Sequence, residues 1–252
     1  MSTNTYVVKK EQCPMCKKLG KDNSHDNLAV YSDGHKFCFS CKYTEFPNKI
    51  TAFKNKEVYD HIDFSAPHLP IDCDIVYPQR ALEWIYQYDL TKEDLLKYNV
   101  MWSESLQRLI FPVFGDGFLI AWQGRSFYLD SELQKKYPKW YGKGNLKDTL
   151  NIMGTGSTLV LTEDVVSAIK VSKCGVRAMP LYGCNVGDRF KLIKTQVKHG
   201  ESVLVWLDPD KRKEGLLEAH RGRIYGLNCR AIISSNDPKE HSYDEIKEKL
   251  NE

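Results

Sequence analysis

The C-terminal part of the chain alternates between short apolar stretches and longer amphipathic ones, and this alternation constrains the fold more than any other feature of the sequence. The apolar stretches, each short enough to be a buried strand, are residues 157–163, 176–183, 202–210 and 229–235. The stretches with helical character that follow them are residues 164–175, 188–200, 211–226 and 243–252. Apolar strands separated by helices predict a parallel sheet that is covered by helices on both faces.

Acidic residues stand at the ends of three of these predicted strands. Glu163 ends the first strand, Asp208 and Asp210 end the third, and Asp237 comes just after the fourth. Because parallel sheets bind ligands at the carboxyl ends of their strands, we expect these carboxylates to lie together. We also expect Asp208-Pro209-Asp210 to be extended, so that both carboxylates point the same way and bind a hard divalent cation such as magnesium.

Glu163 has two possible roles at such a site: it can bind the cation, or it can act as the base for a hydroxyl nucleophile. Taken singly, each acid could instead cap the helix that follows it. Asp164 fits this simpler interpretation well, because it lies early in a predicted helix, near the positive end of the helix dipole.

Four cysteines near the N-terminus form two CxxC pairs, Cys13–Cys16 and Cys38–Cys41, with 21 residues between them. Two thiolates at this spacing can reach one ion from a tight turn, and two such turns complete a tetrahedron. The intervening sequence predicts a hairpin with a turn at Asp33–Gly34. These features favour a zinc ribbon over four unrelated buried cysteines. A site with four protein ligands is coordinatively full, so we expect a structural zinc ion.

Other residues around the cysteines have simpler interpretations. His35 supports the turn or contacts a partner rather than replacing a cysteine ligand, and His25 is a loop residue. Some of the nearby aromatic side chains must pack the small core, and any that are exposed could stack on bases; they are Tyr31, Phe37, Phe39 and Tyr43. The cysteines without metal-binding spacing are expected to be small core residues; they are Cys73, Cys174, Cys184 and Cys229.

The middle of the chain combines a tether with a basic, aromatic region. Residues 44–74 lack a sustained amphipathic pattern and predict a linker. Two short helices are expected next, the second capped by Thr91, and then a hairpin over residues 107–129. The segment 134–147 interleaves five lysines with Tyr137, Trp140 and Tyr141, a mixture that suits a single strand or a nucleoside triphosphate. A solvated basic loop is the alternative.

Composition limits the class of protein. The 252 residues are 42% hydrophobic and 27% charged, as in ordinary globular proteins, and no apolar run reaches the length of a membrane span. The N-terminal residues have no apolar core of a secretory signal, so we expect a cytoplasmic protein with reduced cysteines. The net charge of +3 alone does not establish nucleic-acid binding. Residues 121–150, however, carry six Lys or Arg against three Asp or Glu.

The order of these parts resembles a known family. A four-cysteine ribbon with SDGHKFCFSC, then RLIFPVFGDGFLIAWQGRSF and KKYPKWYGKG, then Glu163, DPD and NDPKE, looks like a bacterial or bacteriophage DNA primase of the TOPRIM class. The ribbon is most similar to the primase half of short phage primase-helicases. The resemblance implies a zinc ribbon over residues 1–43, a linker over 44–74, a basic subdomain of an RNA polymerase core over 75–150, and a Rossmann-like TOPRIM sheet over 151–252.

The resemblance also implies roles for particular residues and partners. The ribbon would read a short template sequence, and the core would synthesise RNA primers from ribonucleoside triphosphates on single-stranded DNA. Magnesium or manganese would be held by Glu163, Asp208 and Asp210, with Asp237 as a further catalytic acid. The implied residues for binding template and nucleotide are Arg108, Arg125, Lys136, Lys139 and Lys143. The family usually has glycine where this chain has Asp164.

The absence of a GxxxxGK[ST] motif predicts that a helicase is not fused to this chain, so that a separate helicase and a DNA polymerase would act beside it in a primosome. Two other functions stay open from the sequence. The first is a TOPRIM nuclease that cleaves nucleic acid with similar acids. The second is a non-enzymatic zinc-ribbon protein that binds DNA.

Overall fold

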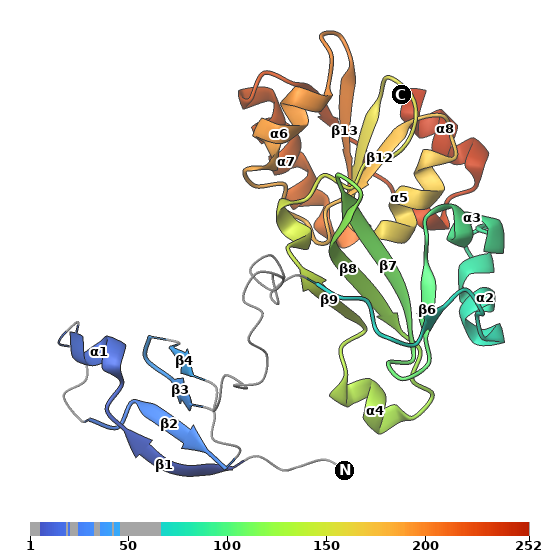
Figure 1. Ribbon diagram of the computed structural model, residues 1–252. Coiled ribbons are helices and arrows are strands. Elements are labelled where there is room, and N and C mark those ends of the chain that lie inside the picture. The colour runs from blue at the N-terminus through green and yellow to red at the C-terminus, as the bar shows by residue number, and fades with distance from the viewer. Residues whose placement is uncertain are drawn as a thin grey trace. The chain divides into compact units, whose positions relative to one another are not determined.

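A computed structural model of the protein describes residues 6–18, 20, 25–32, 36–41, 43–45 and 67–251. The chain divides into two compact units, Met1–Asp63 and Phe64–Glu252 (Figure 1). The predicted turn at Asp33–Gly34, His35 and most of the predicted linker lie outside the described residues. The finer domain boundaries given above stay predictions.

The N-terminal unit is a small antiparallel sheet in the order β1-β2-β3-β4, with one short helix. Its elements are β1 (Val7–Glu11), α1 (Pro14–Lys18), β2 (Leu28–Tyr31), β3 (Lys36–Cys38) and β4 (Thr44–Glu45). Strands β2 and β3 pair with Leu28 opposite Cys38, which confirms the predicted hairpin. His25 is an exposed loop residue, as expected. The buried cluster here consists of three cysteines and Leu28, with Tyr43 packed against it.

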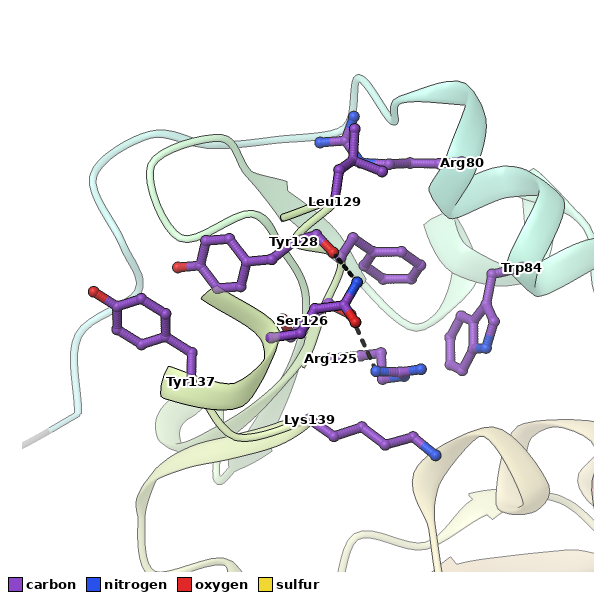
Figure 2. Close-up of a pocket in the computed structure, with 10 residues that line it drawn as sticks. Arg80, Trp84, Arg125, Ser126, Tyr128, Leu129, Tyr137 and Lys139 are labelled. Carbon is purple, nitrogen blue, oxygen red and sulfur yellow. Dashed lines mark hydrogen bonds between the residues drawn. The ribbon is translucent and has the colours of Figure 1, made fainter. Parts of the chain in front are cut away.

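The larger unit begins with an antiparallel sheet in the order β5-β6-β7-β8-β9. Its strands are β5 (Cys73–Asp74), β6 (Met101–Ser103), β7 (Arg108–Gly115), β8 (Phe118–Ser126) and β9 (Trp140–Gly144). The helices of this region are α2 (Gln79–Tyr86), α3 (Lys92–Lys97) and α4 (Ser131–Lys136). Arg80 and Trp84 project from α2 toward the end of β8 (Figure 2).

These elements confirm the two predicted helices and the predicted hairpin. Thr91 caps α3, and it forms a capping box with Asp94. The β7–β8 turn places Asp116 and Gly117 at positive φ values of 51° and 83°, a turn geometry that Asp-Gly sequences favour. Strand β9 was not expected, because its sequence is rich in lysine and glycine, but it pairs with β8 along its whole length.

The C-terminal half of this unit is the predicted parallel sheet, in the order β10-β12-β11-β13-β14. Its strands are β10 (Met153–Gly154), β11 (Leu159–Thr162), β12 (Arg177–Pro180), β13 (Ser202–Trp206) and β14 (Asn228–Ala231), and only β10 pairs antiparallel. Its helices are α5 (Val165–Ser172), α6 (Arg189–Gln196), α7 (Arg212–Ile224) and α8 (Tyr243–Asn251). Short 3-10 helices are η1 (Leu146–Asp148), η2 (Pro209–Lys211) and η3 (Pro238–Glu240).

The predicted α/β fold with helices on both faces is therefore confirmed. Buried side chains of α5 and α8 pack on one face of the parallel sheet, and those of α6 and α7 pack on the other (Figure 1). The first of these cores also contains Trp102, Leu109 and Phe111 from the antiparallel sheet, together with Val160 and Trp206 from the parallel one. The two sheets thus share one core, which fixes their ends relative to each other. None of the helices in the described residues is long and apolar enough to cross a bilayer.

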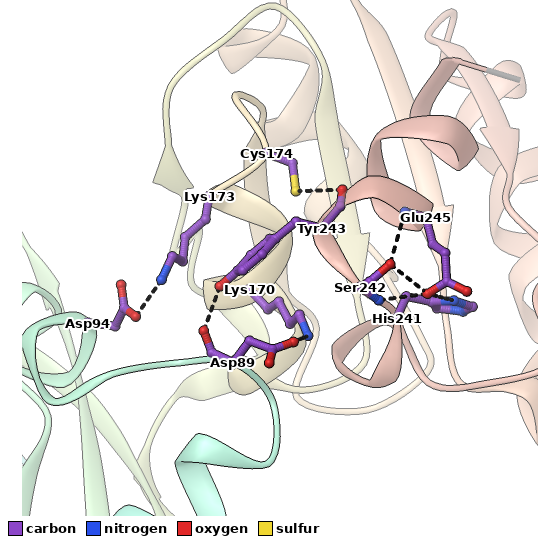
Figure 3. A network of polar contacts seen from close by, with 9 residues as sticks. All are labelled: Asp89, Asp94, Lys170, Lys173, Cys174, His241, Ser242, Tyr243 and Glu245. Atoms are coloured by element: carbon purple, nitrogen blue, oxygen red, sulfur yellow. Dashed lines mark hydrogen bonds and ion pairs between the residues drawn. The ribbon is translucent and has the colours of Figure 1, made fainter.

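A polar network ties α5 and α8 to helix α3 and to the residues between α2 and α3 (Figure 3). Lys170 is 1% exposed, and its Nζ lies 2.9 Å from Asp89 Oδ2. Lys173 Nζ lies 2.6 Å from Asp94 Oδ2. Tyr243 donates its hydroxyl to the Asp89 carbonyl at 2.8 Å, and both lysines lie over the Tyr243 ring. A buried ammonium is costly without an anionic partner, so Asp89 should matter more than its exposed position suggests.

We predict that Asp89→Asn lowers the free energy of unfolding by about 1–2 kcal/mol, because Lys170 loses its charged partner. Asparagine tolerates the positive φ of 52° at this position, so the backbone is not the cause. Urea unfolding of the variant tests this. The matched control is Asp188→Asn, which breaks the exposed Asp188–Lys191 pair. Equal losses in the two variants would contradict the prediction.

Candidate active site

The acidic residues meet at the carboxyl ends of the two central parallel strands. Strands β11 and β13 are neighbours, with Thr162 opposite Trp206, so Glu163 and Asp208 leave the sheet at adjoining strand ends. Both line a pocket of about 470 Å³, together with Asp164 and Asp237. Three of the four predicted catalytic acids are therefore brought together, and Asp164 joins them.

Glu163 and Asp208 each hold a carboxylate oxygen without a partner. Glu163 Oε2 and Asp208 Oδ1 are buried and accept no hydrogen bond from any group in the described part of the chain. Burial raises the pKa of Glu163, and the charge of Asp210 adds to the increase. Burial also raises the pKa of Asp208, to about 7, with Asp237, Asp164 and Glu163 adding to it against the opposing charge of Lys239. These two oxygens suit a hard divalent cation.

Asp164 and Asp237, in contrast, share a lysine. Lys239 Nζ lies 3.0 Å from Asp164 Oδ2 and 2.7 Å from Asp237 Oδ2. Asp164 also caps α5, as it accepts hydrogen bonds from the backbone N–H groups of Val166 and Ser167. Its expected structural role is thus confirmed, and it additionally contributes a charge to the pocket.

Asp210 differs from its expected position. Pro209 opens a 3-10 turn, η2, so the backbone does not stay extended after Asp208 as predicted. The Asp210 side chain is 70% exposed and forms an ion pair with Lys211. It is not among the residues that line the acidic pocket, although its charge still acts on Glu163. Proline fixes φ near the helical value, which favours this turn.

The carboxylate oxygens of the acidic pocket lie farther apart than the ligand atoms of an ion that is bound by protein groups alone. Of the residues that the structure describes, only the four cysteines form a group of three or more potential ligands within 4.8 Å of one another. A wider spacing is compatible with magnesium, which keeps several waters and shares its remaining positions with phosphate oxygens. The partnerless oxygens of Glu163 and Asp208 are the atoms that fit such an ion.

Two of the predicted basic residues lie at this pocket. Arg125 and Lys139 line both the acidic pocket and an adjoining pocket of about 470 Å³ that also contains Arg80, Trp84 and Tyr137 (Figure 2). The Arg125 guanidinium lies 5.2 Å from the ring centre of Trp84 and 5.8 Å from that of Trp140. Burial lowers the pKa of Arg125. Rigid aromatic rings thus hold a cation on the wall between the two pockets.

The other three predicted basic residues lie elsewhere. Arg108 and Lys143 line a separate pocket, and Lys136 is exposed on α4. Arg108 pairs with Ser126, so it faces the opposite side of the sheet from Arg125. It is 4% exposed, and it donates to the carbonyls of Gly124 at 2.9 Å and Pro138 at 2.8 Å. Its contacts therefore hold the β7–β9 region together.

A β-bulge causes this separation. At the turn Gly115 pairs with Phe118, and continuation of that register would place Arg108 opposite Arg125, on one face. The register shifts between Val113 and Phe114, so Arg108 instead opposes Ser126. One extra residue in a strand moves every later side chain to the other face.

Several pocket residues were not found from the sequence. They are Trp84, Tyr88, Gln123, Tyr182, Gly183, Lys239 and Glu240. Gln123 Oε1 is buried and accepts no hydrogen bond from the residues described. Tyr182, two residues after the end of β12, adopts a φ of 56°, which is rare outside glycine. Two features of the sequence could have identified pocket residues. Tyr182 follows an apolar strand, and Lys239 lies two positions from Asp237.

The four N-terminal cysteines form the second candidate site. Their Sγ atoms all lie within 4.8 Å of one another, with 3.5 Å between Cys13 and Cys41 and 3.7 Å between Cys16 and Cys38. Sulfurs about 2.3 Å from a central zinc ion would lie about 3.8 Å apart, whereas a disulfide is about 2.05 Å long. The cluster therefore fits a structural zinc ion and not two disulfides.

Local hydrogen bonds prepare one thiol for this role. Burial raises the pKa of Cys38, but hydrogen bonds from Cys41 and Ser40 outweigh this effect and lower the pKa to about 7. The backbone N–H of Cys41 lies 3.5 Å from the Cys38 sulfur. Burial raises the pKa of Cys16 to about 12, so without a cation this thiol stays protonated. A metal ion would stabilise all four thiolates together.

We predict that Cys16→Ser abolishes zinc binding and unfolds the N-terminal unit, because its described core has few apolar side chains to replace the metal. Zinc content and limited proteolysis measure these effects. The melting temperature of the larger unit should not change. Cys229→Ser is the control, since Cys229 lies in the core of the parallel sheet and should leave the zinc content intact.

We predict that Asp208→Asn stabilises the metal-free protein at pH 8 by about 1–2 kcal/mol, a value reduced from the full pKa effect because the residue is partly exposed. The raised pKa means that the folded protein binds a proton here that the unfolded chain releases. The stability from Asp208 therefore falls as the pH rises from about 4 to about 7. Urea unfolding at pH 4.5 and pH 8 should show that the advantage of the variant is much smaller at the lower pH. An equal advantage at both values would contradict this.

Comparisons with known proteins bear on the fold. No protein-family model matches the sequence, and no curated protein matches it. Among solved structures, the zinc-binding and RNA polymerase domains of the Aquifex aeolicus primase match with a TM-score of 0.57 and 15% identity, over 71% of this chain and 57% of that one. The chain therefore spans somewhat more than half the length of that structure.

A second match is a structure of the bacteriophage T7 lagging-strand DNA polymerase interacting with primase domains of two gp4 subunits bound to an RNA/DNA hybrid and dTTP. Its TM-score is 0.45 at 13% identity, over 64% of this chain and 85% of that one. The Aquifex match has the same combination of a zinc-binding part and a polymerase part that the sequence predicts here. The resemblance to bacterial-type primases is thus confirmed at the level of the fold.

Proposed function

We propose that this protein is a DNA primase, a nucleotidyltransferase that synthesises short RNA primers on a single-stranded DNA template during replication. One observation carries the proposal: an acidic pocket with two partnerless carboxylate oxygens adjoins a basic, aromatic pocket, and Arg125 and Lys139 line both. Nucleotidyl transfer requires cations for the triphosphate next to acids that hold a metal. The fold of the Aquifex primase domains supports the same conclusion.

In this proposal the incoming ribonucleoside triphosphate lies across the boundary of the two pockets. Arg125 and Lys139 bind its phosphates, and Arg125 is held in place by the rings of Trp84 and Trp140. Tyr137, a partly exposed aromatic residue of the basic pocket, would stack on the base. A triphosphate held in this way presents its α-phosphate toward Glu163 and Asp208.

The reaction is attack by a primer 3′-hydroxyl on the α-phosphate, with release of pyrophosphate. Magnesium or manganese, when bound by Glu163 and Asp208, supplies positive charge that stabilises the pentavalent phosphate. Asp210 could join these ligands only after it separates from Lys211. Glu163 offers its free oxygen either to the ion or to the proton of the attacking hydroxyl. Asp237 positions Lys239 at the edge of the pocket.

The N-terminal unit would hold one zinc ion through Cys13, Cys16, Cys38 and Cys41 and contact the template. Phe39, which lies within the second CxxC pair and is 55% exposed, would stack on a base of the template. A separate replicative helicase and a DNA polymerase would complete the primosome, in the cytoplasm of a bacterium or of a phage host. The boundaries predicted from the sequence, 1–43, 44–74, 75–150 and 151–252, are the proposed domain limits, although the two ends of the linker, β4 and β5, pair with strands of the flanking sheets.

The test is incubation of the zinc-loaded protein with single-stranded DNA, labelled ribonucleoside triphosphates and magnesium. We expect new short RNA, which a chelator abolishes. Asp208→Asn should reduce synthesis at least about 100-fold, since it removes a ligand of the catalytic ion, although it stabilises the fold. Lys191→Gln, on the exposed surface of α6, should retain full activity.

Other products would contradict the proposal. Shortened DNA without new RNA would identify a nuclease. Tight DNA binding without any metal-dependent product would identify a binding protein. Synthesis that persists in Asp208→Asn would show that the acidic pocket is not the catalytic centre.

A further inference from the structure

Lys239 is the least expected member of the acidic pocket. Its side chain is 12% exposed, and its ammonium lies within 3.0 Å of both Asp164 and Asp237. It also lies 5.9 Å from the centre of the Tyr88 ring. Burial lowers the pKa of Lys239, but the charge of Asp164 and the hydrogen bond to Asp237 outweigh it and raise the pKa. A permanent positive charge is therefore built into the pocket.

The two partners of this lysine are themselves fixed by the backbone. Asp164 Oδ1 accepts hydrogen bonds from Val166 and Ser167 of α5 at 2.8 Å and 3.0 Å, and its Oδ2 accepts one from the Ser167 hydroxyl at 2.8 Å. Asp237 forms the capping box of η3 with Glu240. These bonds hold both carboxylates where the ammonium meets them, so the group of three has a defined position.

The carboxylates of the pocket consequently fall into two pairs. Asp164 and Asp237 are bridged by Lys239, which leaves one negative charge over three groups. Glu163 and Asp208 have no cationic side chain in ion-pair contact within the described residues, and each keeps a buried oxygen without a hydrogen bond. A single divalent cation balances the second pair. Another divalent cation at the first pair would have to replace or approach an ammonium of the same sign.

We propose that Lys239 takes the place of a second metal ion, so that the pocket binds one divalent cation, at Glu163 and Asp208. The inference rests on the proposed function for the purpose of that cation. Lys239 is then a positioning residue: it orients Asp164 and Asp237 and supplies a fixed charge beside the ion. Phosphoryl transfer here would need one exchangeable cation, with the second charge covalently attached to the protein.

Manganese binding to the zinc-loaded full chain tests the proposal without reference to activity. Electron paramagnetic resonance counts free Mn²⁺ during a titration in the absence of nucleotide. We expect one bound ion per chain, which Glu163→Gln removes. Lys239→Gln frees Asp164 and Asp237 and should raise the count to two, and the further change Asp237→Asn should return it to one.

Two matched variants distinguish the effect of the charge at position 239 from the effect of the net charge of the protein. Lys239→Arg keeps the positive charge and should bind one ion, as the unchanged protein does. Lys191→Gln removes an exposed lysine that pairs with a single acid, and it should also bind one ion although the net charge changes equally. Thermal melting establishes that each variant is folded before its ions are counted.

Two ions in the unchanged protein, or one ion in folded Lys239→Gln, would overturn the inference. In the second case Lys239 would be no barrier to metal binding. Binding that does not respond to Glu163→Gln would overturn both this inference and the metal chemistry of the proposed function. The expected ion counts in a protein that makes no RNA would leave the role of Lys239 intact and overturn only the primase activity.

Discussion

The repulsion between carboxylates at one edge of the parallel sheet is the constraint on which the site depends. Strands β11 and β13 are adjacent and in register, so Glu163, the first residue beyond β11, and Asp208, the second residue beyond β13, lie at adjoining strand ends. Their burial makes this proximity expensive, and it raises the pKa of both groups. Raised carboxylate pKa values of this kind are typical of functional sites, and a bound cation would offset the cost.

The chain relieves this repulsion unevenly. Lysines form ion pairs with three of the acids: Lys239 pairs with Asp164 and Asp237, and Lys211 pairs with Asp210. The two central acids receive no such ion pair within the described residues. Lys239 reaches the pocket because η3 turns the chain back toward α5 after β14, and α5 packs closely against η3. The loop after the last strand thus determines which carboxylates form an ion pair with a lysine and which do not.

The fold could be predicted from the sequence where the pattern is local. Apolar strands alternating with helices indicated the parallel sheet, and Thr91 with Asp94 indicated a helix start. The site was predictable as far as it follows from strand ends, which gave Glu163 and Asp208. It was not predictable where a partner is distant: the Lys239–Asp164 pair joins residues 75 positions apart. The turn at Pro209 could have been predicted, because proline at the first position of a helix favours a 3-10 or α-helical start over an extended backbone.

The basic side of the site shows why spacing alone fails in an antiparallel sheet. Arg108 and Arg125 flank the same hairpin, and a regular hairpin would place them side by side. The shift between Val113 and Phe114 turns Arg108 away, where it holds backbone carbonyls, and leaves Arg125 among aromatic rings at the pocket wall. Pro112 indicates an irregularity in β7, because proline inside a central strand is found mainly at bulges, but it does not specify the residue at which the register shifts. One extra residue in the hairpin thus places Arg125, and not Arg108, on the side of the sheet that faces the acidic pocket. The bulge therefore determines which arginine contributes its positive charge to the site.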